Sequence, residues 1–383
     1  MSNSFTETTH TSYGKRIKNS IVGVFIGIIL FLASFVILWK NEENGARLAK
    51  QEQYIEKNAI EINVDNPNRE NDRKLIATSG KLVTTESLAD ENLMVRDALV
   101  LKRDVEMYQW DEDKNEETHE KIGGGETTTY TYTYNKRWSK SHIDSSRFKQ
   151  QEGHQNPDFP ITSLRLNAPI ALFGGFVGGE LQTASIKDFS PINNLPQSNL
   201  YQIVDGKYYN KDASISYPKV GDIRISYYWA PSGIDVSLIG QQNENNTISK
   251  HPTKYGDIYW QEGGKVNKAG MLKNIKASNS FWTNIFRFVG WLLMFIGLLL
   301  ISKPLSIVLK FIPALGTITG FLAGVVAFLI SIVLSIVTIA VAWFAYRPFS
   351  AILLVIVAGA IIYFTKNIIA KHNNNTIPYD VQP

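Results

Sequence analysis

The chain has 383 residues, no cysteine and a formal net charge of +4. The absence of cysteine excludes thiolate zinc sites, thiol nucleophiles and disulfides. Residues 41–284 carry 29 Lys and Arg against 33 Asp and Glu, a balance of −4. The positive charge therefore belongs to the tails and membrane flanks, and nucleic-acid binding is disfavoured.

The first membrane span is predicted at residues 17–39, after an N-terminal tail at residues 1–16. Residues 21–38 are apolar and uncharged, with Lys15, Arg16 and Lys18 before them and Trp39 after them. About 20 apolar helical residues cross a bilayer. A signal peptide has a shorter apolar core and a small-residue cleavage site, so we predict an uncleaved anchor.

Residues 40–284 form the predicted extramembrane domain. Helices are expected near residues 42–57 and 268–284, at its two ends. Alternating β-branched and aromatic residues predict strands at residues 98–110, 127–138 and 222–229. The acidic residues 111–125 end in three glycines and predict a loop between the first two strands. The domain is thus expected to be a β-rich α+β fold.

Three further spans are predicted near the C-terminus. They cover residues 285–302, 316–346 and 349–365, with a cytoplasmic loop or interfacial segment at 303–315 and a tail at 366–383. Lys303-Pro304 is expected to end the second span, and Arg347-Pro348 to form a turn before the fourth. The alternative is a longer, broken helix in place of the third span. The fold class is an α-helical membrane protein with four spans and an inserted β-rich domain.

Positive charge beside the spans predicts the orientation. Lysine and arginine cluster in the N-terminal tail, in the loop after the second span and in the C-terminal tail. Cytoplasmic loops are enriched in such residues. Both termini are therefore predicted in the cytoplasm and the large domain in the periplasm or lumen.

Candidate chemistry in the domain is sparse. His154 lies in Gly-His-Gln-Asn-Pro, where an acid-base or metal role competes with a simple turn, and the turn is favoured. The acidic run lacks the ligand spacing of a calcium loop. No HExxH, GxSxG or phosphate-loop motif is present. We predict no catalytic residue, no cofactor and no metal.

Glycine spacing within the spans predicts close helix packing. Gly23 and Gly27 form one GxxxG motif, and Gly316, Gly320 and Gly324 form two more. Self-association and packing between spans of one chain are equally compatible with this spacing.

A series of short motifs carries a family resemblance. Glu106, Tyr108 and Trp110 precede the acidic segment, which is followed by a Tyr/Thr strand and Trp138. The remaining motif positions are His154, Asn156, Pro157, Gly221, Asp222, Arg347 and Pro348. Over nearly the whole chain this order resembles the LUMA family, also called transmembrane protein 43. Residues 41–45 depart from it, being longer than the family's Asn-Glu-Gly.

The resemblance implies an integral membrane protein whose eukaryotic relatives lie in the endoplasmic reticulum and inner nuclear membrane, self-associate and organise membrane protein complexes. It implies no catalytic residues. The leading hypothesis is a non-enzymatic scaffold whose partners are the lipid bilayer, further copies of itself and other membrane proteins, in those membranes or in a bacterial inner membrane. The alternative is a lipid-binding or transport protein with an apolar cavity in the domain. A membrane-bound enzyme ranks third.

Overall fold

The computed structural model describes residues 4–91, 93–121, 124–309 and 313–346, together with Ile352 and Ile356. The chain divides into two compact units. The β-rich unit comprises Met1–Thr11, Gln51–Lys121 and Glu126–Lys276, and the helical unit comprises Ser12–Lys50, Ile122–Gly125 and Ala277–Pro383. The expected β-rich domain is therefore present.

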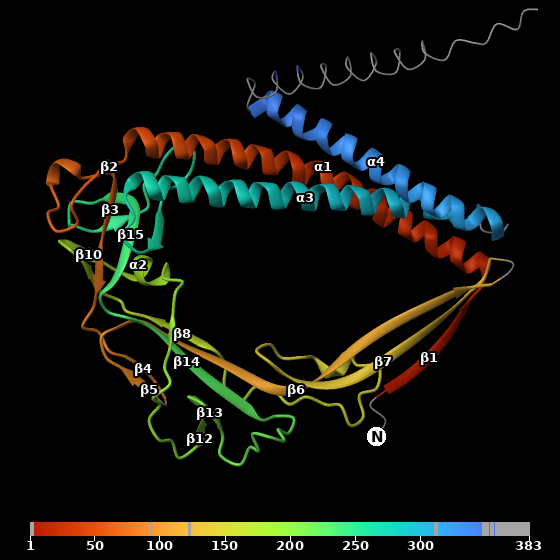
Figure 1. Ribbon diagram of the computed structural model, residues 1–383, viewed down its shortest axis with the longest axis horizontal. Coiled ribbons are helices and arrows are strands. Elements are labelled where there is room, and N and C mark those ends of the chain that lie inside the picture. The colour runs from red at the N-terminus through yellow and green to blue at the C-terminus, as the bar shows by residue number, and fades with distance from the viewer. Residues whose placement is uncertain are drawn as a thin grey trace, which may run out of the picture. The chain divides into compact units, whose positions relative to one another are not determined.

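The larger sheet of the β-rich unit has eight antiparallel strands (Figure 1). Its order is β1-β7-β6-β14-β13-β12, with β8 paired to β6 and β11 to β14. The strands are β1 (Ser4–Thr11), β6 (Ala98–Glu120), β7 (Glu126–Ser139), β8 (Leu164–Asn167), β11 (Ser190–Pro191), β12 (Tyr201–Val204), β13 (Lys207–Asn210) and β14 (Ile223–Pro231).

A second sheet has seven strands in the order β10-β9-β3-β15-β16, with β17 paired to β15 and β2 to β3. These strands are β2 (Ile60–Glu61), β3 (Leu75–Val83), β9 (Ala171–Phe173), β10 (Phe176–Gly178), β15 (Ile234–Gln242), β16 (Ile248–Ser249) and β17 (Trp260–Gly263). A hairpin of β4 (Leu88–Asp90) and β5 (Leu93–Val95) and a short helix, α2 (Glu180–Ala184), complete the unit.

The two sheets share a hydrophobic core. Leu99 and Val100 of β6 pack with Leu82 of β3, Phe173 of β9 and Leu238 of β15, all essentially inaccessible to solvent. Leu99 and Val100 are successive residues, so both faces of β6 are buried at this point. Fully burying one such side chain contributes roughly 1.5–3 kcal/mol.

Strand β6 is longer than predicted. The acidic segment expected as a loop continues β6 to Glu120, and only residues 121–125 separate it from β7. Its residues lie mainly opposite tyrosines and threonines of β7, including Glu112 opposite Tyr134 and Lys114 opposite Tyr132. Arg137 also binds Asp111, with Nε 2.6 Å from Oδ2. The loop prediction was wrong because the segment pairs with β7 from Asp111 to Glu120, and the sequence of the segment alone does not show this partner strand.

The N-terminal residues differ from the prediction as well. Ser4–Thr11 form strand β1, which pairs with β7 through eight residue pairs. The segment predicted as an N-terminal tail at residues 1–16 therefore contains a strand of the larger sheet and the start of α1. The orientation, with both termini in the cytoplasm and the domain outside, stays a prediction. The apolar part of α1 lies between two segments, Met1–Thr11 and residues from Gln51 onward, that both belong to the β-rich unit.

Among the described residues, three helices are long and apolar enough to cross a membrane. They are α1 (Tyr13–Asn58), α3 (Lys268–Leu309) and α4 (Pro313–Tyr346). The helices predicted at residues 42–57 and 268–284 are confirmed, each as part of a longer helix. The third span is one unbroken helix. The predicted fourth span, residues 349–365, lies outside the described residues apart from Ile352 and Ile356.

The second span was predicted to end at Lys303-Pro304, but the helix itself does not end there. Helix α3 continues to Leu309 with Pro304 inside it. A proline removes one helical hydrogen bond and usually kinks or ends a helix. In a helix of 42 residues most of the remaining bonds are unaffected.

Candidate functional site

The family-motif residues of the β-rich unit converge on one place, the point at which β6 changes partners. Up to Met107, β6 pairs with β14, and from Met107 onward it pairs with β7. Beyond Met107, the edge of β6 that β14 occupied would have unpaired backbone groups. Buried backbone groups need hydrogen-bond partners. We call residues 106–110 and the groups that bind them the crossing site.

Backbone groups just before β14 hydrogen-bond the first position of β6 beyond its pairing with β14, Tyr108. The Tyr108 N–H donates to the Asp222 carbonyl at 2.8 Å, and the Gly221 N–H donates to the Tyr108 carbonyl at 2.9 Å. Gly221 has φ of +96°, and a Cβ there would lie 3.2 Å from Pro157 Cγ. Glycine is required because it adopts positive φ without strain.

At the second such position, Trp110, the side chain of Asn156 makes the hydrogen bonds that a neighbouring strand would make. Its Oδ1 accepts from the Trp110 N–H at 2.7 Å, and its Nδ2 donates to the carbonyls of Trp110 at 2.9 Å and Ile143 at 3.1 Å. One carboxamide thus satisfies both backbone groups of Trp110, as a neighbouring strand would.

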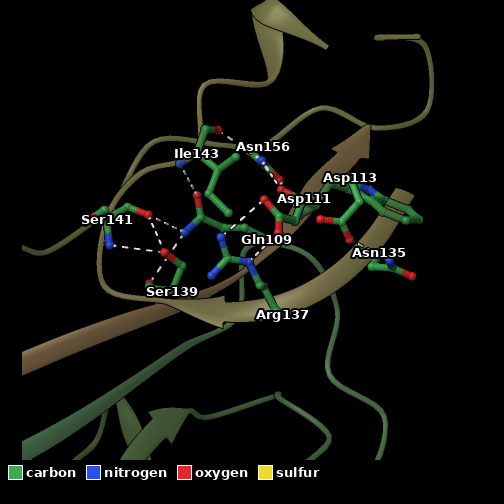
Figure 2. A network of polar contacts seen from close by, with 10 residues as sticks. Gln109, Asp111, Asp113, Asn135, Arg137, Ser139, Ser141, Ile143 and Asn156 are labelled. Atoms are coloured by element: carbon green, nitrogen blue, oxygen red, sulfur yellow. Dashed lines mark hydrogen bonds and ion pairs between the residues drawn. The ribbon is translucent and has the colours of Figure 1, made fainter. Parts of the chain in front are cut away.

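Gln109 anchors the segment that follows β7 (Figure 2). Its fully buried side chain accepts from the Ile143 N–H at 2.8 Å and donates to the Ser141 carbonyl at 3.1 Å. Together with Asn156 it ties β6 to residues 139–143. This network positions the Gly-His-Gln-Asn-Pro turn against the strand.

His154 lies inside an aromatic cluster rather than in an open site. Its side chain is 1% exposed, stacks on Tyr134 at a centroid distance of 4.0 Å and meets the edge of Trp110 at 4.7 Å. Its Nδ1 lies 3.1 Å from the Gln150 carbonyl, to which it donates. The favoured interpretation of this motif as a locally bonded turn agrees with these contacts.

Tyr134 links this cluster to the acidic part of β6. Its hydroxyl donates to Glu112 at 2.8 Å and accepts from the Gln150 N–H at 2.8 Å. Burial, followed by the hydrogen bond to Glu112, raises the pKa of Tyr134 to about 12. The phenol is therefore held neutral as a structural donor.

A second group of motif residues lies beside the first on β6. Arg224 pairs with Glu106 through Nε at 2.7 Å and Nη2 at 3.1 Å, and its guanidinium lies 4.6 Å from the centre of the Trp138 ring. Trp138 also packs on Tyr108, at a centroid distance of 5.4 Å. An ion pair stacked on an aromatic face stabilises the strand pairing.

The arrangement therefore brings together nine of the eleven motif residues, and Arg347 and Pro348 lie outside the described residues. Within the described part of the chain, no group of three or more His, Asp or Glu residues could hold a metal. Asn156, His154, Glu106 and the backbone of Asp222 each bind another part of the unit. These contacts support the path of β6.

The helical unit contains a buried polar cluster that was not predicted from the sequence. Glu42 of α1 is fully buried, and its carboxylate accepts from Arg287 of α3 through Nε at 2.6 Å and Nη2 at 2.8 Å. The indole N–H of Trp343 on α4 donates to the same carboxylate at 2.6 Å. We call these three residues the helix clamp, because they join all three described long helices.

Neighbouring bonds reinforce the helix clamp. Asn41 donates to the Thr283 carbonyl at 3.0 Å, and the Trp39 indole donates to the Tyr346 hydroxyl at 3.1 Å. A signal was available in the sequence: Arg287 lies within the predicted span 285–302, where a charge requires a partner.

The glycines of the predicted packing motifs differ in whether another helix lies close to them. A Cβ on Gly27 would lie 2.8 Å from the Gly297 carbonyl and 2.9 Å from Leu300 Cβ, so this glycine packs α1 on α3. A Cβ on Gly23 or Gly324 would meet no atom within 4 Å. Packing within one chain is therefore found at Gly27. The side-chain surroundings of Gly316 and Gly320 lie outside the description.

Three cavities lie within single units. Each of two apolar cavities in the helical unit has a volume of about 430 Å³, one between α1 and α4 and one between α3 and α4. A cavity of about 550 Å³ in the β-rich unit is lined by both polar and apolar residues, among them Asp235 and Trp260. The cavity in the β-rich unit therefore differs from the apolar cavity that the alternative hypothesis expected there, and the apolar cavities lie among the helices.

Long apolar helices joined by a buried ion pair, in one chain with a large β-rich unit, define a multi-pass integral membrane protein. The sequence model of the family described as Transmembrane protein 43 matches residues 107–348, more than half of the chain. The chain belongs to this family, which confirms the resemblance to the LUMA family.

Relatives match over most of their length. Transmembrane protein 43 from Rattus norvegicus and from Homo sapiens are each 29% identical to the chain over 358 residues, covering 89% of this chain and 88% of the relative. The Transmembrane protein 43 homolog from Drosophila melanogaster is 25% identical over 364 residues, covering 90% and 95%. No solved structure matches the chain.

Proposed function

We propose that this protein is an integral membrane scaffold that organises membrane protein complexes or membrane structure without catalysing a reaction. It associates with further copies of itself and presents the β-rich unit to partners on the periplasmic or lumenal side. Its membrane is the bacterial inner membrane or, in a eukaryotic host, the endoplasmic reticulum or inner nuclear membrane.

The crossing site carries this proposal. Its polar groups are the best candidates for chemistry in the family motif, and each is bonded to another part of the same unit. Asn156 makes three hydrogen bonds to the backbone of Trp110 and Ile143. Groups held in this way maintain a shape, which is the requirement for a binding surface rather than for catalysis.

The helix clamp supports the same function from the helical unit. A scaffold needs a base whose helices keep fixed neighbours. The Glu42 carboxylate on α1 is fully buried. If α1 separated from α3 or α4, this carboxylate would lose a partner, which is energetically costly for a buried charge. The clamp therefore favours one arrangement of the three helices.

The test is crosslinking in native membranes with identification of the neighbours by mass spectrometry, together with the mass of the purified protein in detergent. We expect a self-associated species and a reproducible set of membrane-protein neighbours. Asn156→Ala should lose neighbours that bind the β-rich unit, whereas Asn135→Ala, an exposed amide on β7, should retain them. A protein that remains monomeric at all concentrations and has no reproducible neighbour would contradict the scaffold.

A second candidate function is lipid binding, and the apolar cavities favour it. Val36, Val337 and Val341 line the cavity between α1 and α4, and Trp39 and Lys40 lie at one end. Val341→Trp should displace a bound acyl chain, whereas Ile336→Trp, at an exposed position that does not line the cavity, should not. Native mass spectrometry of the protein released from nanodiscs measures the difference, and equal lipid retention would exclude this site.

A further inference from the structure

Strand β1 is an unusually long strand at the edge of a sheet. It ends the strand order on one side of the eight-stranded sheet and has eight residues, whereas the strand at the other end, β12, has four. The path of the second sheet ends in β10 and β16, with three and two residues. Edge strands present unpaired N–H and C=O groups that can pair with another chain.

Three usual protections of an edge strand are absent from β1, and its one charged side chain, Glu7, is paired with Lys149. Its sequence, Ser-Phe-Thr-Glu-Thr-Thr-His-Thr, contains no proline and no lysine. Its register on β7 runs without a bulge from Ser4 opposite Thr133 to Thr11 opposite Glu126. Five of the eight residues are β-branched or aromatic types that favour strands. The outer edge of β1 is therefore well formed for strand addition.

The strands beside β1 have little apolar packing to stabilise them. From Asp113 to Glu120, every residue of β6 is exposed, and Thr129–Thr133 of β7 are only partly buried. Short sheets exposed on both faces are marginally stable in water. Additional strands would extend the hydrogen-bonded ladder and the aromatic face on which Phe5 packs against Tyr132.

We propose that the outer edge of β1 pairs antiparallel with β1 of a second copy of this chain. The inference rests on the proposed self-association and assigns a surface to it. A second copy is the occupant because β1 is complementary to itself in one register, and that register follows from the geometry of the strand.

The pleat restricts the possible registers. Every second residue of β1 directs its backbone groups to the outer edge, so a residue numbered odd must oppose an odd one, and even must oppose even. A pairing centred on Thr8 joins Phe5–Thr11 of both copies and places Thr8 opposite Thr8. The neighbouring register, centred on Glu7, would place two carboxylates opposite each other, which is destabilising. The Thr8-centred register is therefore preferred.

Two single-cysteine variants test this register in native membranes, because the chain has no cysteine of its own. In the proposed pairing, Thr8→Cys lies opposite its copy, within the Cα separation that a disulfide spans. Glu7→Cys lies diagonal to its copy at about 7–8 Å, beyond easy reach. We expect a disulfide-linked dimer for Thr8→Cys at several times the yield of Glu7→Cys. Equal yields, or a higher yield at Glu7, would overturn the proposal.

A charge variant tests the same surface without a crosslink. Thr8→Lys places two ammonium groups opposite each other at the dyad and should weaken association about tenfold. Thr129→Lys changes the neighbour of Thr8 on β7, away from the edge, and should leave association unchanged. Thr8 is exposed, so the substitution leaves the fold intact, which thermal unfolding would verify.

The outcomes separate this surface from the proposed function. If amine-reactive crosslinking still yields dimers of Thr8→Lys, and Thr8→Cys forms no disulfide, the β1 surface is wrong and self-association stands. If the unmodified chain forms no dimer by any method, the self-associating scaffold fails together with its surface.

Discussion

The crossing site and the helix clamp both use polar side chains to join segments that are distant in sequence, but they do so with different chemistry. At the crossing site a neutral amide, Asn156, substitutes for a strand. In the helix clamp a fully buried carboxylate, Glu42, is balanced by Arg287 and Trp343. The first satisfies backbone groups that the fold already has, whereas the second introduces a charge that must be matched.

This difference in chemistry predicts how much stability each region loses when one polar group is removed. Removing an amide leaves neutral backbone groups without partners, at a cost of about 1–3 kcal/mol for each buried group. Removing one member of a buried ion pair leaves an uncompensated charge, at a cost of about 3–5 kcal/mol. We therefore expect the helix clamp to be the more sensitive region.

The largest effect is expected for Arg287→Leu. The variant leaves the Glu42 carboxylate buried with only the Trp343 indole, so the helical unit should lose about 3–5 kcal/mol of stability. Thermal unfolding of the purified protein in detergent measures the loss. The double variant Glu42→Gln/Arg287→Leu should recover most of it, because Gln still accepts from Trp343 and carries no charge. A double variant as unstable as Arg287→Leu would refute this account of the clamp.

A smaller effect is expected for Asn156→Ala. The N–H and carbonyl of Trp110 lose their partner, so the free energy of unfolding should fall by about 2–3 kcal/mol. Chemical denaturation of the full chain, followed by tryptophan fluorescence, measures the change. Asn135→Ala is the control, because its amide is exposed and makes a single bond of 3.2 Å to Asp113. Its effect should stay within about 0.5 kcal/mol. Equal losses in both variants would remove the special role of Asn156.

The pH dependence of Tyr134 gives a third, weaker effect. At neutral pH Tyr134→Phe should cost about 0.5–1.5 kcal/mol through its lost hydrogen bonds. The folded-state pKa of Tyr134 is raised to about 12, above the ordinary tyrosine value of 10.0, so this contribution is complete below pH 10 and is lost as the pH rises toward 12. The stability difference between wild type and Tyr134→Phe should therefore shrink over that range. Tyr217→Phe, at a side chain 82% exposed, should show no such trend.

The last prediction concerns the edge of the larger sheet and tests placement rather than stability. Thr6→Cys/Thr131→Cys joins residues that lie opposite each other on β1 and β7, so a disulfide should form readily. Thr6→Cys/Thr127→Cys moves the second cysteine four residues along β7, about 13 Å away, and should not form one. Mobility on a non-reducing gel after cleavage between the strands measures the bond. Failure of the first pair would contradict the pairing of β1 with β7.

Several features of the fold were predictable because they depend on local periodicity. The apolar runs that became α1, α3 and α4 follow from the requirement that a membrane helix satisfy its own backbone. The strands β7 and β14 were found within two residues of their ends, because Thr and Tyr alternate in the first and β-branched and aromatic residues dominate the second. The family motif also marked His154 and Asn156, although their contacts were unknown.

Other features depend on partners far away in the chain, and no local pattern contains them. Glu120 belongs to a strand only because β7 lies opposite. Ser4–Thr11 contain one large apolar residue, Phe5, so their periodicity indicated no core. The helix clamp joins residues separated by 245 and 301 positions.

The sequence by itself determined that this chain is anchored in a membrane by long apolar helices and carries a β-rich domain without cysteine chemistry. The tertiary structure alone decided which polar residues meet: Asn156 at the edge of β6, and Glu42 with Arg287 and Trp343 among the helices. The reason is physical. Hydrophobic length and strand alternation are properties of a segment, whereas a buried hydrogen bond or ion pair exists only when the fold brings its two members together.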